Sequence, residues 1–151
     1  MDNLESTLAA HPFLAGLSPQ YLQLVAECAS LANFTADQVI FRAGAKAHQV
    51  YLLRFGQVAV LIHRPRRGPK ILYTLQEGDV LGTFRSEQES EWFFDAQALG
   101  VVRTISLDFN CLQKLCDQHP DLGYELMKRF VRSQAKMLKI LKLQLVDFYG
   151  S

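Results

Sequence analysis

The residues best suited to bind a small molecule lie between positions 82 and 95. Three aromatic side chains stand together here, Trp92, Phe93 and Phe94, and aromatic faces can stack on a planar or apolar ligand. In an extended segment alternate side chains share a face, so Phe93 is predicted to point away from Trp92 and Phe94. The local charge is −3, because one cation, Arg85, stands against four acids, Glu87, Glu89, Glu91 and Asp95. An anionic ligand would meet repulsion unless Arg85 turned inward.

Other chemically active side chains are scattered. The spacing of the four histidines (His11, His48, His63, His119) matches no haem setting, and the three cysteines lack zinc or iron–sulfur spacing. Cys28, Cys111 and Cys116 are therefore expected to be buried, reduced thiols. No serine–histidine–acid arrangement and no phosphate-binding loop appears. We expect a protein that is not an enzyme and carries no cofactor, haem or metal.

Composition limits the function classes further. The chain has 151 residues, 49% apolar and 21% charged, which suits one domain with a real core. Sixteen basic and fifteen acidic residues leave a net charge of +1, which argues against a general nucleic-acid-binding protein. The sequence contains no long apolar run and no signal-peptide pattern at its start. We expect a cytoplasmic protein without a membrane segment.

The pattern along the chain predicts a single mainly β domain over residues 1–151 with flanking helices. Residues 1–33 are predicted to be helical, since Ser18-Pro19 is a strong helix start and apolar residues recur behind it at helical spacing. Residues 34–109 carry short β-branched and aromatic runs separated by glycines, which is typical of a sandwich or barrel. Residues 110–149 are helical again, with a short helix that ends near His119-Pro120 and a long one over about 121–148.

The long terminal helix predicts a homodimer. At about 40 Å it would be longer than a small β-domain, so part of its apolar face needs another partner, and a second copy of the helix is the simplest one. The expected interface residues are Phe130, Met137, Leu138, Leu141 and Leu145.

Cations gather on the same helix. Six lie between Glu125 and Asp147 without an acid among them: Lys128, Arg129, Arg132, Lys136, Lys139 and Lys142. A solvated face is the expected interpretation, and contact with nucleic acid, a membrane surface or an acidic partner stays open. The cations of residues 64–70 are expected on an exposed hairpin loop.

Residues 41–60 carry a specific pattern of Phe41, Gly44, Ala47, Tyr51, Gly56 and Val58. With Gly78-Asp-Val-Leu-Gly82 and Asp95-Ala-Gln-Ala-Leu99, this pattern resembles the cyclic-nucleotide-binding domain superfamily, in particular the effector domain of the bacterial cyclic-AMP receptor family. The resemblance implies an antiparallel β-roll (a double-stranded β-helix or jelly roll) with N-terminal helices and a long C-terminal helix that forms the dimer interface. It is closest to a divergent stand-alone branch without the helix-turn-helix module, although a truncated chain is the alternative.

The ligand cassette departs from that family. Nucleotide-binding relatives carry Gly-Glu, a short helix and then Arg-Ala-Ala, in which glutamate binds the ribose and arginine the cyclic phosphate. Here Thr83 stands in the glutamate position, Trp92 in the arginine position, and Phe93 and Phe94 replace the alanines. Loss of a buried charge-assisted partner costs about 2–5 kcal/mol, so ordinary cyclic-AMP binding is disfavoured.

Three hypotheses follow. The first is a dimeric regulatory domain that senses an unidentified small effector and signals through the dimer helix, with a site made by Gly82, Thr83, Phe84, Arg85, Trp92 and Phe94. The second is a ligand-dead homodimeric module in which the aromatic side chains fill the pocket and a protein partner docks. The third is weak cyclic-AMP or cyclic-GMP binding through Arg85 and backbone amides.

Overall fold

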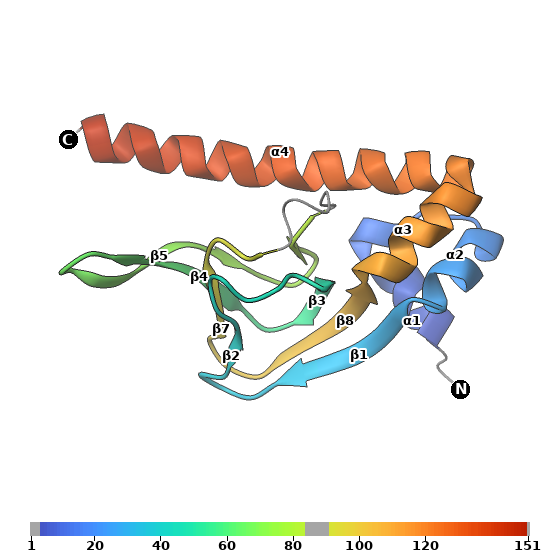
Figure 1. Ribbon diagram of the computed structural model, residues 1–151, viewed down its shortest axis with the longest axis horizontal. Helices are drawn as coiled ribbons and strands as arrows, with labels where there is room; N and C mark the ends of the chain where they lie inside the picture. Colours follow the sequence, from blue (N-terminus) through green and yellow to red (C-terminus); the bar gives the residue numbers. More distant parts are fainter. Residues whose placement is uncertain (1–3, 84–90, 151) are drawn as a thin grey trace.

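The computed structural model describes residues 4–83 and 91–150. The chain opens with α1 (Leu4–Ala10), a 3-10 turn η1 (Pro12–Leu14) and α2 (Pro19–Ala26). Ser18 caps α2 as its sequence predicts, because its hydroxyl accepts a hydrogen bond from the Tyr21 amide and Pro19 takes the first turn. Figure 1 shows these helices at one end of the molecule and the β4–β5 hairpin at the other.

Antiparallel strands form two four-stranded sheets. The strands are β1 (Ala29–Phe34), β2 (Val39–Phe41), β3 (Gln49–Phe55), β4 (Val58–Arg64), β5 (Gly68–Leu75), β6 (Val80–Leu81), β7 (Asp95–Ala98) and β8 (Val102–Asp108). One sheet has the order β1-β8-β3-β6 and the other β2-β7-β4-β5. The predicted fold class, an antiparallel β-roll with helices before and after it, is confirmed.

Two helices complete the chain, α3 (Phe109–Gln118) and α4 (Pro120–Gly150). Asp108 caps α3 by accepting a hydrogen bond from the Cys111 amide. α4 runs along the length of the molecule (Figure 1). None of the helices in the described part of the chain combines the length and apolarity needed to cross a bilayer.

The core has two parts, one on each face of the β1-β8-β3-β6 sheet. Side chains alternate along β8, so Ile105 and Leu107 contact the helices while Val102 lies inside the roll. α4 contributes to both parts: Leu122, Leu126 and Phe130 pack with the other helices, and Met137 packs with the roll interior. This one helix therefore ties the helical end to the β-roll.

The N-terminal helical region is shorter than residues 1–33. Helix α2 ends at Ala26, and Ala29–Phe34 form β1, which pairs with β8 from Ala29↔Leu107 to Phe34↔Val102. The spacing of Cys28, Ala29 and Leu31 resembled a helix, but the backbone pairing available along β8 overrides that local preference.

The expectation of three reduced thiols is wrong for two of them. Cys28 and Cys111 form a disulfide across 83 residues, with a Cα–Cα distance of 5.5 Å. The β1–β8 register places Cys28 beside Asp108, whose amide donates to the Cys28 carbonyl, and Cys111 lies one turn into α3. Cys116 is the free cysteine of the described residues, and burial raises the pKa of its thiol.

Removal of this disulfide should destabilise the domain. Because the bond closes a long loop, Cys28→Ala/Cys111→Ala should lower the free energy of unfolding by about 2–4 kcal/mol, measured by urea denaturation. Reduction of the wild type should have a similar effect, and Cys116→Ala is the matched control that leaves the bond intact. Equal stability with and without reductant, or free thiols at both positions by mass spectrometry, would show that the bond does not form.

Candidate functional site

Trp92, the residue in the expected arginine position, lies inside the roll and is 4% exposed. Its indole stacks on Phe41 with ring centroids 3.7 Å apart and planes within 5°. The backbone of Trp92 is also held in place, because its amide donates to the Ala45 carbonyl and its carbonyl accepts from the Gly44 amide. Trp92 is therefore a fixed part of the core.

Gly82 lies directly against this indole. Its φ is +105°, and a Cβ there would lie 3.0 Å from Cη2 of Trp92 and 3.0 Å from a methyl of Val50. An L-side chain at this position would meet both backbone strain and a ring that cannot move away. Gly82 thus permits the close packing of Trp92 in addition to forming the turn.

The aromatic run divides between the two faces as its sequence predicts. Phe93 is 79% exposed, whereas Phe94 is partly buried with its centroid 6.0 Å from Trp92 and 5.8 Å from Phe41. Thr83 is half-buried. Of the six candidate ligand residues, Phe84 and Arg85 lie outside the described residues. The structure brings Gly82, Trp92 and Phe94 together.

Two further aromatic residues extend this cluster. Tyr51 lies 6.5 Å from Phe41 between ring centroids, and burial raises the pKa of its phenol. Phe34 meets Tyr51 edge to face at 6.0 Å. Phe41 and Tyr51 were visible in the sequence only as members of the family pattern. Their proximity to Trp92 depends on strand pairing and could not be derived from spacing.

Three cavities of about 300, 230 and 150 Å³ open on the described part of the chain. None of these three is lined by Gly82, Thr83, Trp92 or Phe94. Among the described residues no three histidine, cysteine, aspartate or glutamate side chains are grouped to hold a metal ion. The aromatic cluster offers stacking surfaces for a planar or apolar group.

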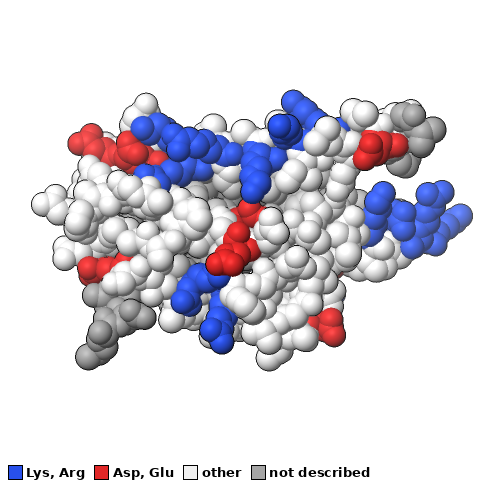
Figure 2. Space-filling view, turned by 180° about the vertical axis from the view of Figure 1, so that it is seen from behind, with Lys and Arg blue, Asp and Glu red and all other residues white. Residues whose placement is uncertain are grey.

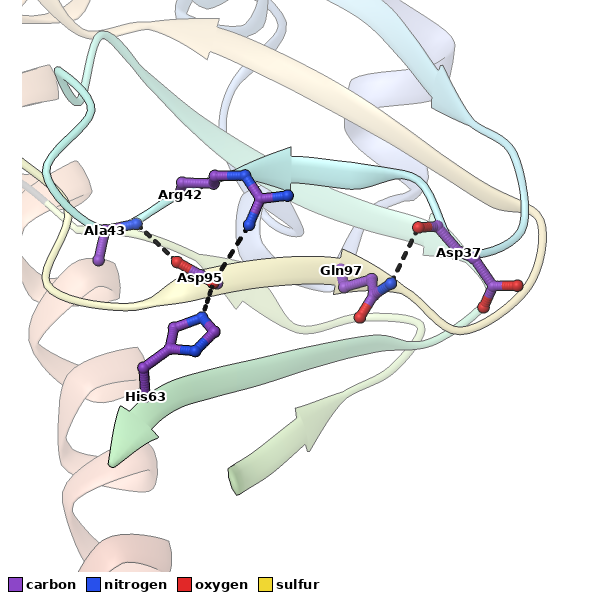
Figure 3. A network of polar contacts seen from close by, with 6 residues as sticks. All are labelled: Asp37, Arg42, Ala43, His63, Asp95 and Gln97. Carbon is purple, nitrogen blue, oxygen red and sulfur yellow. Dashed lines mark hydrogen bonds and ion pairs between the residues drawn. The ribbon is translucent and has the colours of Figure 1, made fainter. Parts of the chain in front are cut away.

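Asp95 follows the aromatic run directly and belongs to a polar network on the outer face of the β2-β7-β4-β5 sheet (Figure 3). Asp95 is nearly buried, and its Oδ1 accepts a 2.7 Å hydrogen bond from the Ala43 amide. Its Oδ2 lies 2.6 Å from Nε2 of His63 and 3.8 Å from Arg42. Desolvation alone would raise the pKa of Asp95, but the Ala43 and His63 hydrogen bonds and the Arg42 charge together lower it.

This network joins three segments beside the aromatic cluster. Asp95 lies on β7, His63 on β4, and Ala43 follows β2. The Asp95 carboxylate thus ties β7 to β4 and to the segment after β2, and Trp92 precedes it by three residues. The network therefore has a positioning role, which sequence reasoning missed because Asp95 was read only as part of the local charge and the family pattern.

Comparison with known proteins agrees with this architecture. Residues 31–119 match the family described as "Cyclic nucleotide-binding domain". A curated relative is the HTH-type transcriptional regulator Cmr of Mycobacterium tuberculosis, 24% identical over 126 residues, which are 83% of this chain and 50% of the relative. The chain thus spans about half the length of that regulator.

Solved structures show the same fold. A putative cyclic nucleotide-binding protein from Geobacter metallireducens superposes with a TM-score of 0.78 at 20% identity, covering 91% of this chain and 99% of that one. The regulatory subunit of a cAMP-independent protein kinase A from Trypanosoma cruzi, bound to guanosine, gives 0.61 at 22% identity, covering 80% and 47%. Since the family pattern covers more than half of the sequence, this chain belongs to the cyclic nucleotide-binding domain family.

Proposed function

We propose that this protein is a regulatory domain of the cyclic-nucleotide-binding type that does not hold a cyclic phosphate in the usual way, and that it signals as a homodimer through α4. The observation that carries the proposal is the buried Trp92–Phe41 stack. An indole in the position of the family's arginine offers no charge to a phosphate, and its ring takes up space inside the roll. The regulatory role is supported by the kinship with a transcriptional regulator. The cytoplasmic location stays a prediction.

The dimer part of the proposal needs a revised set of residues. Phe130 and Met137 are 2% and 7% exposed and belong to the protomer's own core, so they are not available to a second copy. Leu138, Leu141 and Leu145 stay in the proposal. Four exposed apolar residues recur at intervals of seven along one side of α4, at Tyr124, Val131, Leu138 and Leu145. An interval of seven residues is the repeat of one of the two core positions in a coiled-coil seam.

A second candidate function, a ligand-dead module that docks a protein partner, is favoured by the same stack. Its distinguishing expectation is that no nucleotide or nucleoside binds. A nucleoside without phosphate is a further possibility for the sensing role, because the Trypanosoma cruzi relative binds guanosine and aromatic side chains can stack on a base.

Cyclic nucleotides should not stabilise the protein. With 1 mM cyclic AMP or cyclic GMP, we expect no rise in Tm in a thermal-shift assay, whereas a ligand at 100 times its Kd would add about 2.7 kcal/mol, or roughly 5–10 °C. A cyclic-AMP-binding domain measured in parallel is the positive control. A rise of several degrees with either nucleotide would contradict the proposal, and a rise with guanosine alone would identify nucleoside sensing.

Truncation of Trp92 should destabilise the domain far more than truncation of Phe93. Trp92→Ala removes a buried ring and should lower the free energy of unfolding by about 3–5 kcal/mol. The matched control Phe93→Ala removes an exposed ring and should change it by less than about 0.5 kcal/mol. Urea denaturation measures both. Equal effects of the two substitutions would mean that the indole does not fill the roll in solution.

The proposed seam can be tested with two leucines of similar exposure. Leu138 is 53% exposed on the seam, and Leu143 is 57% exposed about 140° away around the helix. By sedimentation equilibrium, Leu138→Lys should weaken dimerisation at least tenfold because it buries a charge in the seam. Leu143→Lys should leave it unchanged. A monomeric wild type, or equal effects of the two substitutions, would refute the α4 seam.

A further inference from the structure

The cavity of about 230 Å³ lies where three distant segments meet, η1, the turn before β6, and α4. Its polar lining consists of Asp79, Arg129, Arg132, Ser133 and Lys136. Positions 129, 132, 133 and 136 share one face of α4, because residues three and four apart are neighbours on a helix. Seen from behind, Lys and Arg side chains gather along α4 at the upper edge, with acidic side chains below them (Figure 2).

The charge of this lining is positive. Three cations stand against one carboxylate, and that carboxylate is already engaged. Oδ1 of Asp79 lies 2.7 Å from Nζ of Lys136, and its Oδ2 accepts a 2.9 Å hydrogen bond from the Gln76 amide, which closes the turn. The cavity therefore keeps a net charge of +2 that its own acid does not neutralise.

One of the cations is held rigidly. Nη1 of Arg129 donates to the carbonyls of Phe13 and Ala15, both at 2.8 Å, and the side chain is only 15% exposed. Its Nε is buried without a hydrogen-bond partner among the described residues. Arg129 thus fixes a positive charge in the wall, while Arg132 and Lys136 are exposed and Lys136 is paired with Asp79.

We propose that this cavity binds a small phosphomonoester, with the phosphate against Arg132, Lys136 and Ser133. A guanidinium fork, an ammonium and a hydroxyl together suit a dianionic phosphate. The neighbouring cavity of about 300 Å³ shares Pro12 and Gly78 with this one and adds Thr7, Arg54 and Glu77. It gives the organic part of such a ligand both room and hydrogen-bonding groups.

The position of this cavity suits an effector site. It is separate from the aromatic interior of the roll, and Arg132 and Lys136 lie roughly 120–160° around α4 from Leu138 on the proposed seam. The proposed phosphate ligands lie on α4, and η1 and the turn before β6 supply the other walls of the cavity, so a bound ligand would contact all three segments. Its binding would stabilise one placement of the helix against the roll.

Inorganic phosphate is the first probe, and glycerol 3-phosphate is the second. For a Kd of about 5 mM, 50 mM phosphate should raise the Tm by about 3–5 °C over chloride at equal ionic strength. Arg132→Gln/Lys136→Gln should weaken binding about tenfold and reduce the rise to about 1 °C. Glycerol 3-phosphate should bind at least as tightly as phosphate, since its organic part reaches the neighbouring cavity.

The matched control is Arg67→Gln/Lys139→Gln, which also removes one arginine and one lysine charge, but outside the cavity lining. This variant should keep the full phosphate-induced rise in Tm. The Tm of each variant in phosphate is compared with its own Tm in chloride, so a change in the variant's basal stability does not affect the comparison. A rise of equal size in both double variants would show only the general stabilising effect of the salt and would overturn the proposal. Equal rises with acetate and phosphate, or no rise above chloride, would overturn it as well.

Discussion

Strands β3 and β8 are buried on both faces, and this double burial constrains the rest of the structure. Val50 and Leu52 of β3 contact the helices, while Leu53 lies inside the roll. A strand buried on both faces needs a layer on each side, which the second sheet and the helices supply. α4 belongs to both layers, since Phe130 packs on one side of the β1-β8-β3-β6 sheet and Met137 reaches the interior on the other.

The aromatic cluster fills the interior of the roll around Trp92. Trp92 stacks on Phe41 and is buried with it inside the roll. Gly82 accommodates the ring, and the Asp95 network holds the strand that follows. These features support one another, because Trp92 packs directly against Gly82 and its backbone is hydrogen-bonded to Gly44 and Ala45.

α4 carries three different faces, and their separation matters for any regulatory role. One face is buried against the two cores, one presents apolar residues at intervals of seven, and one lines the basic cavity with Arg129, Arg132 and Lys136. A ligand on the basic face and a second copy on the apolar face would not compete for space. Both would act on a helix already bound to the roll, which is the arrangement that couples two sites through one rigid element.

The sequence by itself determined the fold class and the long terminal helix. Those features depend on local signals: Ser18-Pro19 starts a helix, short apolar runs between glycines make strands, and Phe93 alternates with Trp92 and Phe94. Tertiary structure decided the rest. The β1–β8 register turned Ala29–Phe34 into a strand and joined Cys28 to Cys111. Packing of α4 on the other helices and on the roll buried Phe130 and Met137 and assembled the basic cavity from segments more than 40 residues apart. Helical periodicity shows that a residue is apolar and which neighbours share its face, but which surface covers that face depends on contacts between distant segments.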